Sequence, residues 1–249
     1  MSAPLLSVRG LDKKFGGLAA VQQVDMDLHP GVLTALVGPN GAGKTTLFNL
    51  ITGNIPADSG EVLLDGASIR GRSPHHIARL GVARSFQDLR LFARMTVREN
   101  VLAAIEHTAW LWQPGGRSAR RAREAAVEQA LERTGLTAQA NARAMDLAYA
   151  ERKFLSVARI LATGSRIWLL DEPASGLDLH SRARFVSLVR QAAAEGVTIC
   201  LIEHNLDIVT ELADRIAFLD RGAKLAEGDP QDILRDPELI GIYFGERRT

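Results

Sequence analysis

Residues 35–53 read ALVGPNGAGKTTLFNLITG, and this stretch decides the fold. It begins inside an apolar run, VLTALV at 32–37, that is typical of a buried strand, and it ends in TTLFNLIT, a run typical of an amphipathic helix. Between them the sequence matches the pattern GxxxxGK[ST], a glycine-rich turn that binds phosphate groups. The residues of the pattern are Gly38, Gly43, Lys44 and Thr45. The alternative is an ordinary glycine-rich turn after a buried strand; the complete pattern and both flanking elements argue against it.

Each residue type in this turn has a physical reason to contact a nucleoside triphosphate. Glycines let the backbone curl so that successive N–H groups face inward, and the following helix offers unpaired N–H groups and the positive end of its dipole. Lys44 adds a positive charge toward the β- and γ-phosphate oxygens. The Thr45 hydroxyl is placed to ligate Mg²⁺, which prefers oxygen ligands. The residues expected to contact the nucleotide here are Gly38, Pro39, Asn40, Gly41, Ala42, Gly43, Lys44, Thr45 and Thr46.

The composition excludes several classes of protein. The 249 residues are 46% hydrophobic, which is enough for a core, and the formal net charge of +1 gives no global field toward nucleic acid or anionic lipid. The single cysteine, Cys200, precludes an internal disulfide and suits a reducing cytoplasm. No run of about 18 apolar residues occurs and MSAPLLSVRG lacks a signal-peptide pattern, so we expect neither a membrane span nor secretion.

Apolar runs that alternate with helix-forming segments predict an α/β fold. The strand-like runs are LLSVR, VDMDL, VLTALV, EVLLD, RIWLLD, VTICLIE and RIAFLD. Several are continuously apolar, as in a mostly parallel sheet that is covered on both faces. D-G and R-G turns in VLLDGASI and LDRGAKLAEGD predict antiparallel hairpins at the sheet edges. Over about 71–162 the sequence is rich in Ala, Arg, Glu and Leu, which predicts a helical subdomain inserted into a single domain spanning 1–249.

The stretch RIWLLDEP, residues 166–173, is the candidate second half of the nucleotide site. A buried strand here would place Asp171 and Glu172 at its carboxyl end, where open α/β sheets bind ligands. Asp171 then suits the Mg²⁺ shell through water. Glu172 is positioned to polarise the water that attacks the γ-phosphorus. A solvated turn after a buried strand would explain the DE pair alone, but phosphoryl-transfer sites need both parts, and both are present.

Four motifs carry a resemblance to a known family. GPNGAGKTT, RSFQDLRLF, LLDEPASGLD and LIEHN occur in the order, and near the spacing, of ABC transporter ATPase subunits, and the chain resembles these subunits over essentially its whole length. The resemblance implies an α/β fold of the P-loop NTPase (ABC ATPase) class. It also implies ATP and Mg²⁺ as cofactors, with ATP hydrolysed between two subunits.

The resemblance also implies roles for single residues. Gln87 matches the glutamine that links the metal site to the transmembrane partner, His204 matches the histidine that contacts the γ-phosphate, and Phe15 is the candidate for stacking on adenine. Each has a plainer alternative: Phe15 in the core, Gln87 as an exposed polar residue, and His204 as a structural histidine. The implied metal ligands are Thr45, Gln87 and Asp171, and the implied catalytic residues are Glu172 and His204.

Two stretches match the parts of the family that face a second subunit. The family's D loop matches Ser175, Gly176, Leu177 and Asp178. Asp178 could also cap a helix that begins near His180, and capping and site function can coexist. The family's signature usually reads LSGGQ. Here the aligned stretch is LAYAE, which consists of Leu147, Ala148, Tyr149, Ala150 and Glu151.

The altered signature motivates a hypothesis about the two ATP sites of a dimer. Ala148 replaces the serine, and losing its hydrogen bond to a charged γ-phosphate costs about 1.5–3 kcal/mol. Ala150 replaces the second glycine and adds a methyl group, while the helix N-terminus still offers its amides. We hypothesise that this subunit's phosphate turn, completed by a partner's intact signature, hydrolyses ATP well and that the reciprocal site is slower. The alternative is that this variant works normally in its own lineage.

The most specific resemblance is to the larger of the two ATPase subunits in branched-chain amino acid importers, carried by GLAAVQQVDMDL, VARSFQDLRLFARMTVRENVLAA and GDPQDILRDPELIGIYFG. Related importers carry urea, amides or aromatic acids. The resemblance implies two transmembrane permeases, a second ATPase subunit and an extracytoplasmic solute-binding protein. The altered signature favours a distinct second chain over an identical one. The implied location is peripheral, on the cytoplasmic face of the inner (plasma) membrane.

An ABC-type ATPase that acts on nucleic acid or ribosomes is the alternative class. Such proteins generally carry two ATPase domains, long coiled arms or zinc-binding cysteines, none of which this sequence shows. The basic cluster Arg117, Arg120, Arg121 and Arg123 is interspersed with Ala and Glu, as on a solvated helix face, so we expect no nucleic-acid partner. A small-molecule kinase would share the phosphate turn but would not explain SGLD or LIEHN.

Overall fold

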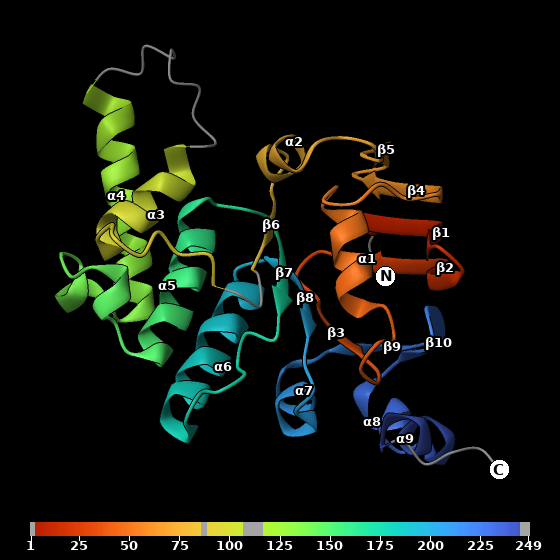
Figure 1. Ribbon diagram of the computed structural model, residues 1–249. Helices are drawn as coiled ribbons and strands as arrows, with labels where there is room; N and C mark the ends of the chain where they lie inside the picture. Colours follow the sequence, from red (N-terminus) through yellow and green to blue (C-terminus); the bar gives the residue numbers. More distant parts are fainter. Residues whose placement is uncertain (1–2, 86–88, 107–116, 245–249) are drawn as a thin grey trace.

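The computed structural model describes residues 3–85, 89–106 and 117–244, and its centre is a six-stranded sheet (Figure 1). The strand order is β10-β9-β3-β8-β7-β6. All neighbouring pairs are parallel except β10 and β9, which form an antiparallel hairpin at one edge. The prediction of a mostly parallel sheet with an edge hairpin is confirmed. The strands are β3 (Leu33–Val37), β6 (Val82–Arg84), β7 (Ile167–Asp171), β8 (Thr198–Ile202), β9 (Arg215–Asp220) and β10 (Ala223–Gly228).

The continuously apolar runs form the central strands because both faces of this sheet are buried. In β7, Trp168 and Leu170 belong to one hydrophobic cluster, while Leu169 belongs to the other. In β8, Leu201 belongs to the first of these clusters and Cys200 to the second. Successive side chains of a strand point to opposite faces, so a strand with two covered faces needs apolar residues at every position.

A second, antiparallel sheet of order β2-β1-β4-β5 packs against one face through helix α1. The alternation in VDMDL is confirmed, since Val24, Met26 and Leu28 are all buried in the cluster shared by this sheet and the central one. Phe48 and Ile51 of α1 fill the same cluster. The elements are β1 (Leu6–Phe15), β2 (Leu18–Leu28), β4 (Ser59–Leu64), β5 (Ala67–Ser68) and α1 (Lys44–Ile51).

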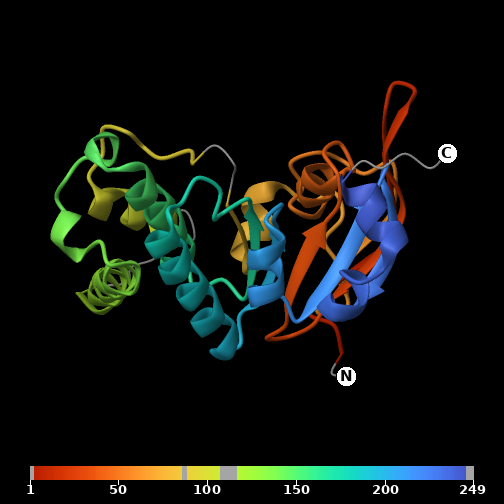
Figure 2. The ribbon, with the colours of Figure 1, turned by 90° about the horizontal axis from the view of Figure 1, so that it is seen from below.

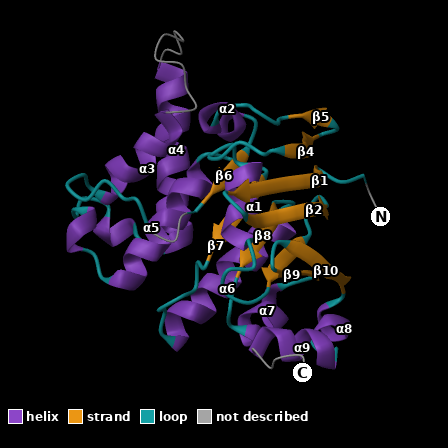
Figure 3. Ribbon diagram, turned by 45° about the vertical axis from the view of Figure 1, so that its right-hand side comes forward, coloured by secondary structure: helices purple, strands orange, loops and turns teal. Residues whose placement is uncertain are grey.

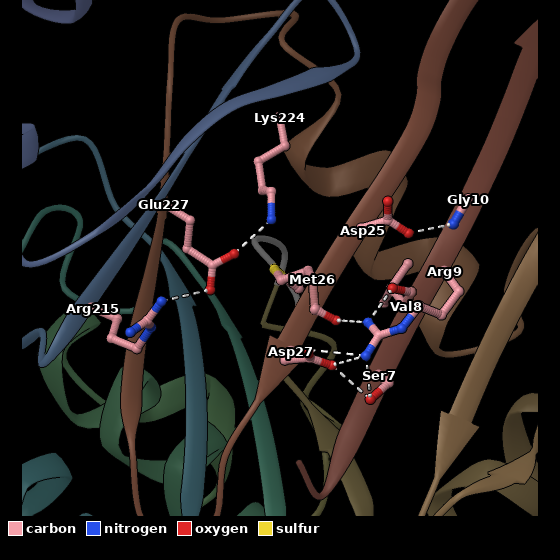
Figure 4. A network of polar contacts seen from close by, with 10 residues as sticks. All are labelled: Ser7, Val8, Arg9, Gly10, Asp25, Met26, Asp27, Arg215, Lys224 and Glu227. Carbon is pink, nitrogen blue, oxygen red and sulfur yellow. Dashed lines mark hydrogen bonds and ion pairs between the residues drawn. The ribbon is translucent and has the colours of Figure 1, made fainter. Parts of the chain in front are cut away.

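Polar contacts fix the edge pairs of both sheets (Figure 4). Arg9 of β1 pairs with Asp27 of β2 at 2.7 Å. On β10, the Glu227 carboxylate lies 2.6 Å from Lys224 and 3.3 Å from Arg215 of β9. The side chains of Arg9 and Asp27 are 44% and 33% exposed, so this pair contributes at most about 1 kcal/mol. These contacts therefore support strand register while the apolar clusters supply most of the stability.

Helices cover the opposite face of the central sheet, and a helical group lies beyond them (Figures 1 and 3). Helices α5, α6 and α7 share a hydrophobic cluster with the sheet, and α3 and α4 contact α5 on its far side. Figure 2 shows the same arrangement from below, with the helical group apart from the antiparallel strands. The helices are α2 (Pro74–Arg79), α3 (Val97–Glu106), α4 (Arg117–Thr134), α5 (Tyr149–Ala162), α6 (Leu179–Ala194), α7 (Leu206–Leu212), α8 (Pro230–Ile233) and α9 (Pro237–Phe244), with 3-10 turns Thr137–Gln139 and Ala144–Asp146.

The structure differs from the sequence-based expectation within the range 71–162. This range contains β6, whose Val82 pairs in parallel with Ile167 of β7, so a strand of the central sheet precedes the helical group. Three residues are too few to show a strand periodicity, which is why the sequence pattern did not reveal it. Within the described ranges, none of the helices combines the length and apolar character that a membrane span requires.

Candidate functional site

The phosphate turn connects β3 to α1, and neighbouring strands press against it. Gly43 is the N-cap of α1 and has a left-handed φ of 99°. A Cβ at Gly38 would overlap the carbonyl oxygen of Leu219 in β9, and one at Gly43 would overlap that of Ala20 in β2. Glycine is therefore required for close backbone packing as well as for room around a phosphate. The sequence pattern had indicated only the second reason.

Lys44 occupies the centre of this turn. Its ammonium group donates hydrogen bonds to the carbonyl oxygens of Gly38 at 2.6 Å and Pro39 at 2.9 Å. Burial lowers the pKa of Lys44, and the negative charges of Glu172 and Asp171 oppose that shift. The turn thus holds a cation in a fixed position where the sequence places the β- and γ-phosphates.

The phosphate turn opens into a cavity of about 1090 Å³ that is large enough for a nucleotide. Its walls include residues 40–46, Phe15, Glu172 and His204, so the structure brings these predicted site residues to one place. Arg221 and Leu18 also line it, and no motif in the sequence marks either residue. Phe15 is 48% exposed, and the alternative in which it is a core residue is wrong.

Glu172 and His204 meet at the carboxyl ends of the neighbouring strands β7 and β8. The His204 Nε2 atom lies 3.0 Å from Glu172 Oε1. Glu172 has a left-handed φ of 46°, a conformation that is costly for a residue with a side chain and that is found at functional sites. Its backbone is held on both sides, because its N–H donates to Ile202 O at 3.0 Å and its carbonyl accepts from Lys153 Nζ at 2.9 Å.

Asp171 lies deeper than Glu172 and is 2% exposed. Its backbone N–H donates to the Ser85 hydroxyl at 2.9 Å, and one carboxylate oxygen lies 3.3 Å from the Arg84 guanidinium. Burial raises the pKa of the Asp171 carboxyl, and the Arg84 charge acts in the opposite direction. Arg84 is the last residue of β6, and Ser85 follows it directly. The sequence pattern did not reveal this strand.

The residues present fit a magnesium ion. Asp171 Oδ1 is buried and has no hydrogen-bond partner within the described part of the chain. The Thr45 side chain acts to lower the pKa of this carboxyl, against the larger effect of burial. A carboxylate oxygen and a hydroxyl at the end of a phosphate turn are the hard oxygen donors that Mg²⁺ uses beside a nucleotide. Gln87, the third predicted ligand, lies outside the described residues.

The signature stretch and the D loop contact each other, and both lie apart from the cavity. The Tyr149 hydroxyl donates to the Ser175 carbonyl at 3.3 Å, and a Cβ added to Gly176 would lie 2.8 Å from the Tyr149 ring. Among the residues that the structure describes, neither 147–151 nor 175–178 contributes to the cavity wall. Within one chain, these predicted residues therefore form a separate surface.

Carboxylates cap the two helices that begin at this surface. Glu151 accepts a hydrogen bond from the Ala148 N–H at 2.8 Å, so it caps α5 although Ala148 has no hydroxyl. Asp178 caps α6 by accepting from the Ser181 N–H at 2.9 Å, which confirms the capping role considered from the sequence. The capping role of Glu151 adds to its predicted place in the signature stretch.

Comparisons with known proteins agree with this geometry. The family model described as ABC transporter matches residues 21–175. The chain is 42% identical over 257 residues to the high-affinity branched-chain amino acid transport ATP-binding protein LivG of Escherichia coli (strain K12), covering 99% of this chain and 100% of LivG. It is 41% identical over 255 residues to the corresponding protein BraF of Pseudomonas aeruginosa, covering 99% and 100%.

The fold is similar to that of solved ATP-binding cassettes. The crystal structure of the ADP conformation of MJ1267, an ATP-binding cassette of an ABC transporter, superposes with a TM-score of 0.87 at 28% identity, covering 98% of this chain and 100% of MJ1267. Its nucleotide-binding fold is therefore shared along the whole length of the chain. Because the family model covers more than half of the residues and the relatives align from end to end, this chain belongs to the ABC transporter family.

Proposed function

We propose that this chain is the ATP-hydrolysing motor subunit of an importer, and that the importer carries branched-chain amino acids or a related small polar solute. One observation carries the hydrolytic role: Glu172 and His204 lie 3.0 Å apart in the wall of the cavity that begins at the phosphate turn. The proposed solute class is supported by similarity to LivG and BraF, whose names describe branched-chain amino acid transport.

The residues of the cavity have separate roles in ATP binding and hydrolysis. The amides of the phosphate turn and the Lys44 ammonium bind the β- and γ-phosphates, and Phe15 stacks on the adenine ring. Glu172 orients a water molecule toward the γ-phosphorus and accepts its proton as the bond to the β-γ bridging oxygen breaks. His204 holds the Glu172 carboxylate and contacts the γ-phosphate. Mg²⁺, held by Thr45 and Asp171 with Gln87, would offset the negative charge of the phosphates.

Completion of the site requires a second ATPase chain. The surface formed by 147–151 and 175–178 lies apart from the cavity of its own chain, so it is available to close the cavity of another. We infer a complex with this second ATPase subunit and two transmembrane permeases, to which an extracytoplasmic solute-binding protein delivers the solute. The chain would then be peripheral, on the cytoplasmic face of the inner membrane.

The altered signature gives a prediction about the reciprocal site. Changing Ala148→Ser and Ala150→Gly together should raise ATP hydrolysis by the assembled complex by up to about twofold, because the serine restores a hydrogen bond to the γ-phosphate and the slower site can then match the site that already hydrolyses ATP well. The steady-state rate of phosphate release measures the effect. Ala122→Ser, on the exposed face of α4, is the matched control and should change nothing. An unchanged rate in the double variant would mean that LAYAE functions normally as it stands.

The experiment that tests the proposed function is reconstitution of the full complex in liposomes. ATP hydrolysis should rise when the solute-binding protein is supplied with leucine, isoleucine or valine, and the amino acid should accumulate in the compartment on the ATPase side. Stimulation by urea, amides or aromatic acids would assign a related solute. Stimulation by nucleic acid or ribosomes, with none by any solute, would contradict the transport role.

A further inference from the structure

The carbonyl group of His204 is held from a distant part of the chain. The Tyr243 hydroxyl, on helix α9, donates a hydrogen bond to the His204 carbonyl oxygen at 2.6 Å across 39 positions of sequence. The Tyr243 ring packs edge-on against Phe218 of β9, with ring centroids 6.4 Å apart, and Phe218 is itself buried. The hydroxyl is therefore fixed by packing on the central sheet, and it limits movement of the chain at His204.

The residue before His204 carries a buried carboxylate. Glu203 is 3% exposed, and its Oε1 accepts a hydrogen bond from the Ala174 N–H at 3.0 Å. Burial raises the pKa of Glu203, while the N–H groups of Ala174 and His204 stabilise its charged form and lower it. Ala174 follows Glu172 by two positions, so this hydrogen bond joins the residue before His204 to the backbone beside the catalytic glutamate.

The chain beyond His204 is fixed as well. Asn205 caps α7, since its side-chain oxygen accepts from the N–H groups of Asp207 at 3.0 Å and Ile208 at 3.3 Å. With the following turn held, the Tyr243 hydroxyl fixes the peptide group between His204 and Asn205 and so limits the positions that the imidazole can take. The 3.0 Å contact between His204 and Glu172 tolerates little displacement. A group that holds the backbone of His204 can therefore affect the rate of ATP hydrolysis.

We propose that Tyr243 and Glu203 are positioning residues for His204: Tyr243 holds its carbonyl group, and Glu203 anchors the chain just before it to Ala174, so that the imidazole stays against Glu172. Neither touches the nucleotide cavity among the described residues, so they act through His204 and not on ATP. The inference rests on the proposed hydrolytic roles of Glu172 and His204. It gives α9, a C-terminal element remote in sequence from the phosphate turn, a part in hydrolysis.

Tyr243→Phe tests the proposal, because it removes the hydroxyl and keeps the ring that packs on Phe218. The value of kcat for ATP hydrolysis by the assembled complex should fall about 2- to 10-fold, the worth of one neutral hydrogen bond, while the Kd for MgATP changes by less than twofold. Thr210→Val is the matched control, since it removes a hydroxyl that donates to a backbone carbonyl, Leu206 O, within α7. It should leave both quantities unchanged.

A spectroscopic measurement separates positioning from general loosening of the fold. In ¹⁵N-histidine-labelled full-length protein, the Nε2 resonance of His204 should move in Tyr243→Phe toward its position in Glu172→Ala, because the contact is lost in both. Glu203→Gln, which keeps one acceptor oxygen, should give a smaller loss of kcat than Glu203→Ala. The assignment of the resonance comes from the spectrum of His204→Ala.

The possible failures are distinguishable. If Glu172→Gln hydrolyses ATP at the wild-type rate, the proposed hydrolytic role of Glu172 is wrong and the inference falls with it. If Glu172→Gln is inactive but Tyr243→Phe matches the wild type in kcat and in the Nε2 resonance, the inference alone is overturned. An equal loss of MgATP binding and kcat in Tyr243→Phe, with an unmoved resonance, would also overturn it, because that result describes a stability defect only.

Discussion

Glu172→Gln should lower ATP hydrolysis by the assembled complex by roughly 100- to 10,000-fold, the usual contribution of a general base, and should leave MgATP binding nearly unchanged. The amide occupies the same volume but cannot accept the proton of the attacking water. The Glu172 backbone contacts to Ile202 and Lys153 do not involve the carboxylate, so the strand end should keep its shape. Phosphate release measures hydrolysis, and calorimetric titration measures binding.

Glu132→Gln provides the matched control for this variant, because it makes the same chemical change on the exposed face of α4. It should hydrolyse ATP like the wild type. Near-normal hydrolysis by Glu172→Gln would remove this residue from the chemistry and leave the attacking water to another group.

Lys44→Ala should weaken MgATP binding by about 10- to 150-fold, since a hydrogen bond to a charged group contributes about 1.5–3 kcal/mol. The ammonium group also bridges the carbonyl oxygens of Gly38 and Pro39, so its removal loosens the turn that positions the amides. Hydrolysis at low ATP concentration should fall by at least the same factor. Titration calorimetry of the purified chain measures the change in Kd.

Lys224→Ala is the control for loss of a lysine, because Lys224 pairs with Glu227 on β10 and does not line the cavity within the described ranges. Its Kd for MgATP should match that of the wild type. The pair of site variants is informative together: an equal loss of binding in Lys44→Ala and Glu172→Gln would contradict the separate roles of capture and turnover.

The sequence predicted those features that depend on local pattern. The phosphate turn was predictable because its glycines, lysine and threonine lie within eight residues of the chain, 38–45, between two recognisable elements. The carboxyl end of β7 was predictable because a continuously apolar run stops at Asp171 and Glu172. The alternation of VDMDL likewise predicted the buried face of β2.

Features that depend on contacts between distant segments could not be predicted in the same way. Arg84 and Ser85 reach Asp171 only because β6 pairs with β7, and a three-residue strand leaves no periodicity to read. Glu203 lay within LIEHN, but its role follows from burial against the Ala174 N–H. The need for glycine at 38 arises from Leu219 in β9, far along the chain.

The signature stretch illustrates both situations. The sequence located LAYAE at the start of a helix, and Tyr149 is indeed the first residue of α5. The packing of the Tyr149 ring on Gly176 joins this stretch to the D loop, a contact that no spacing rule indicates. The functional residue types and their local elements could therefore be predicted from the sequence. How those residues are arranged around the cavity could be seen only in the folded structure.

The most direct measurement of the central claim is a single turnover of ATP in the assembled complex. Wild-type and Glu172→Gln complexes are loaded with ATP labelled at the γ-phosphate, mixed with Mg²⁺, and quenched at intervals to separate ATP from phosphate. We predict that both complexes retain labelled ATP at the outset and that only the wild type converts it. Conversion by Glu172→Gln at the wild-type rate, or failure of the wild-type complex to bind ATP at all, would contradict the account.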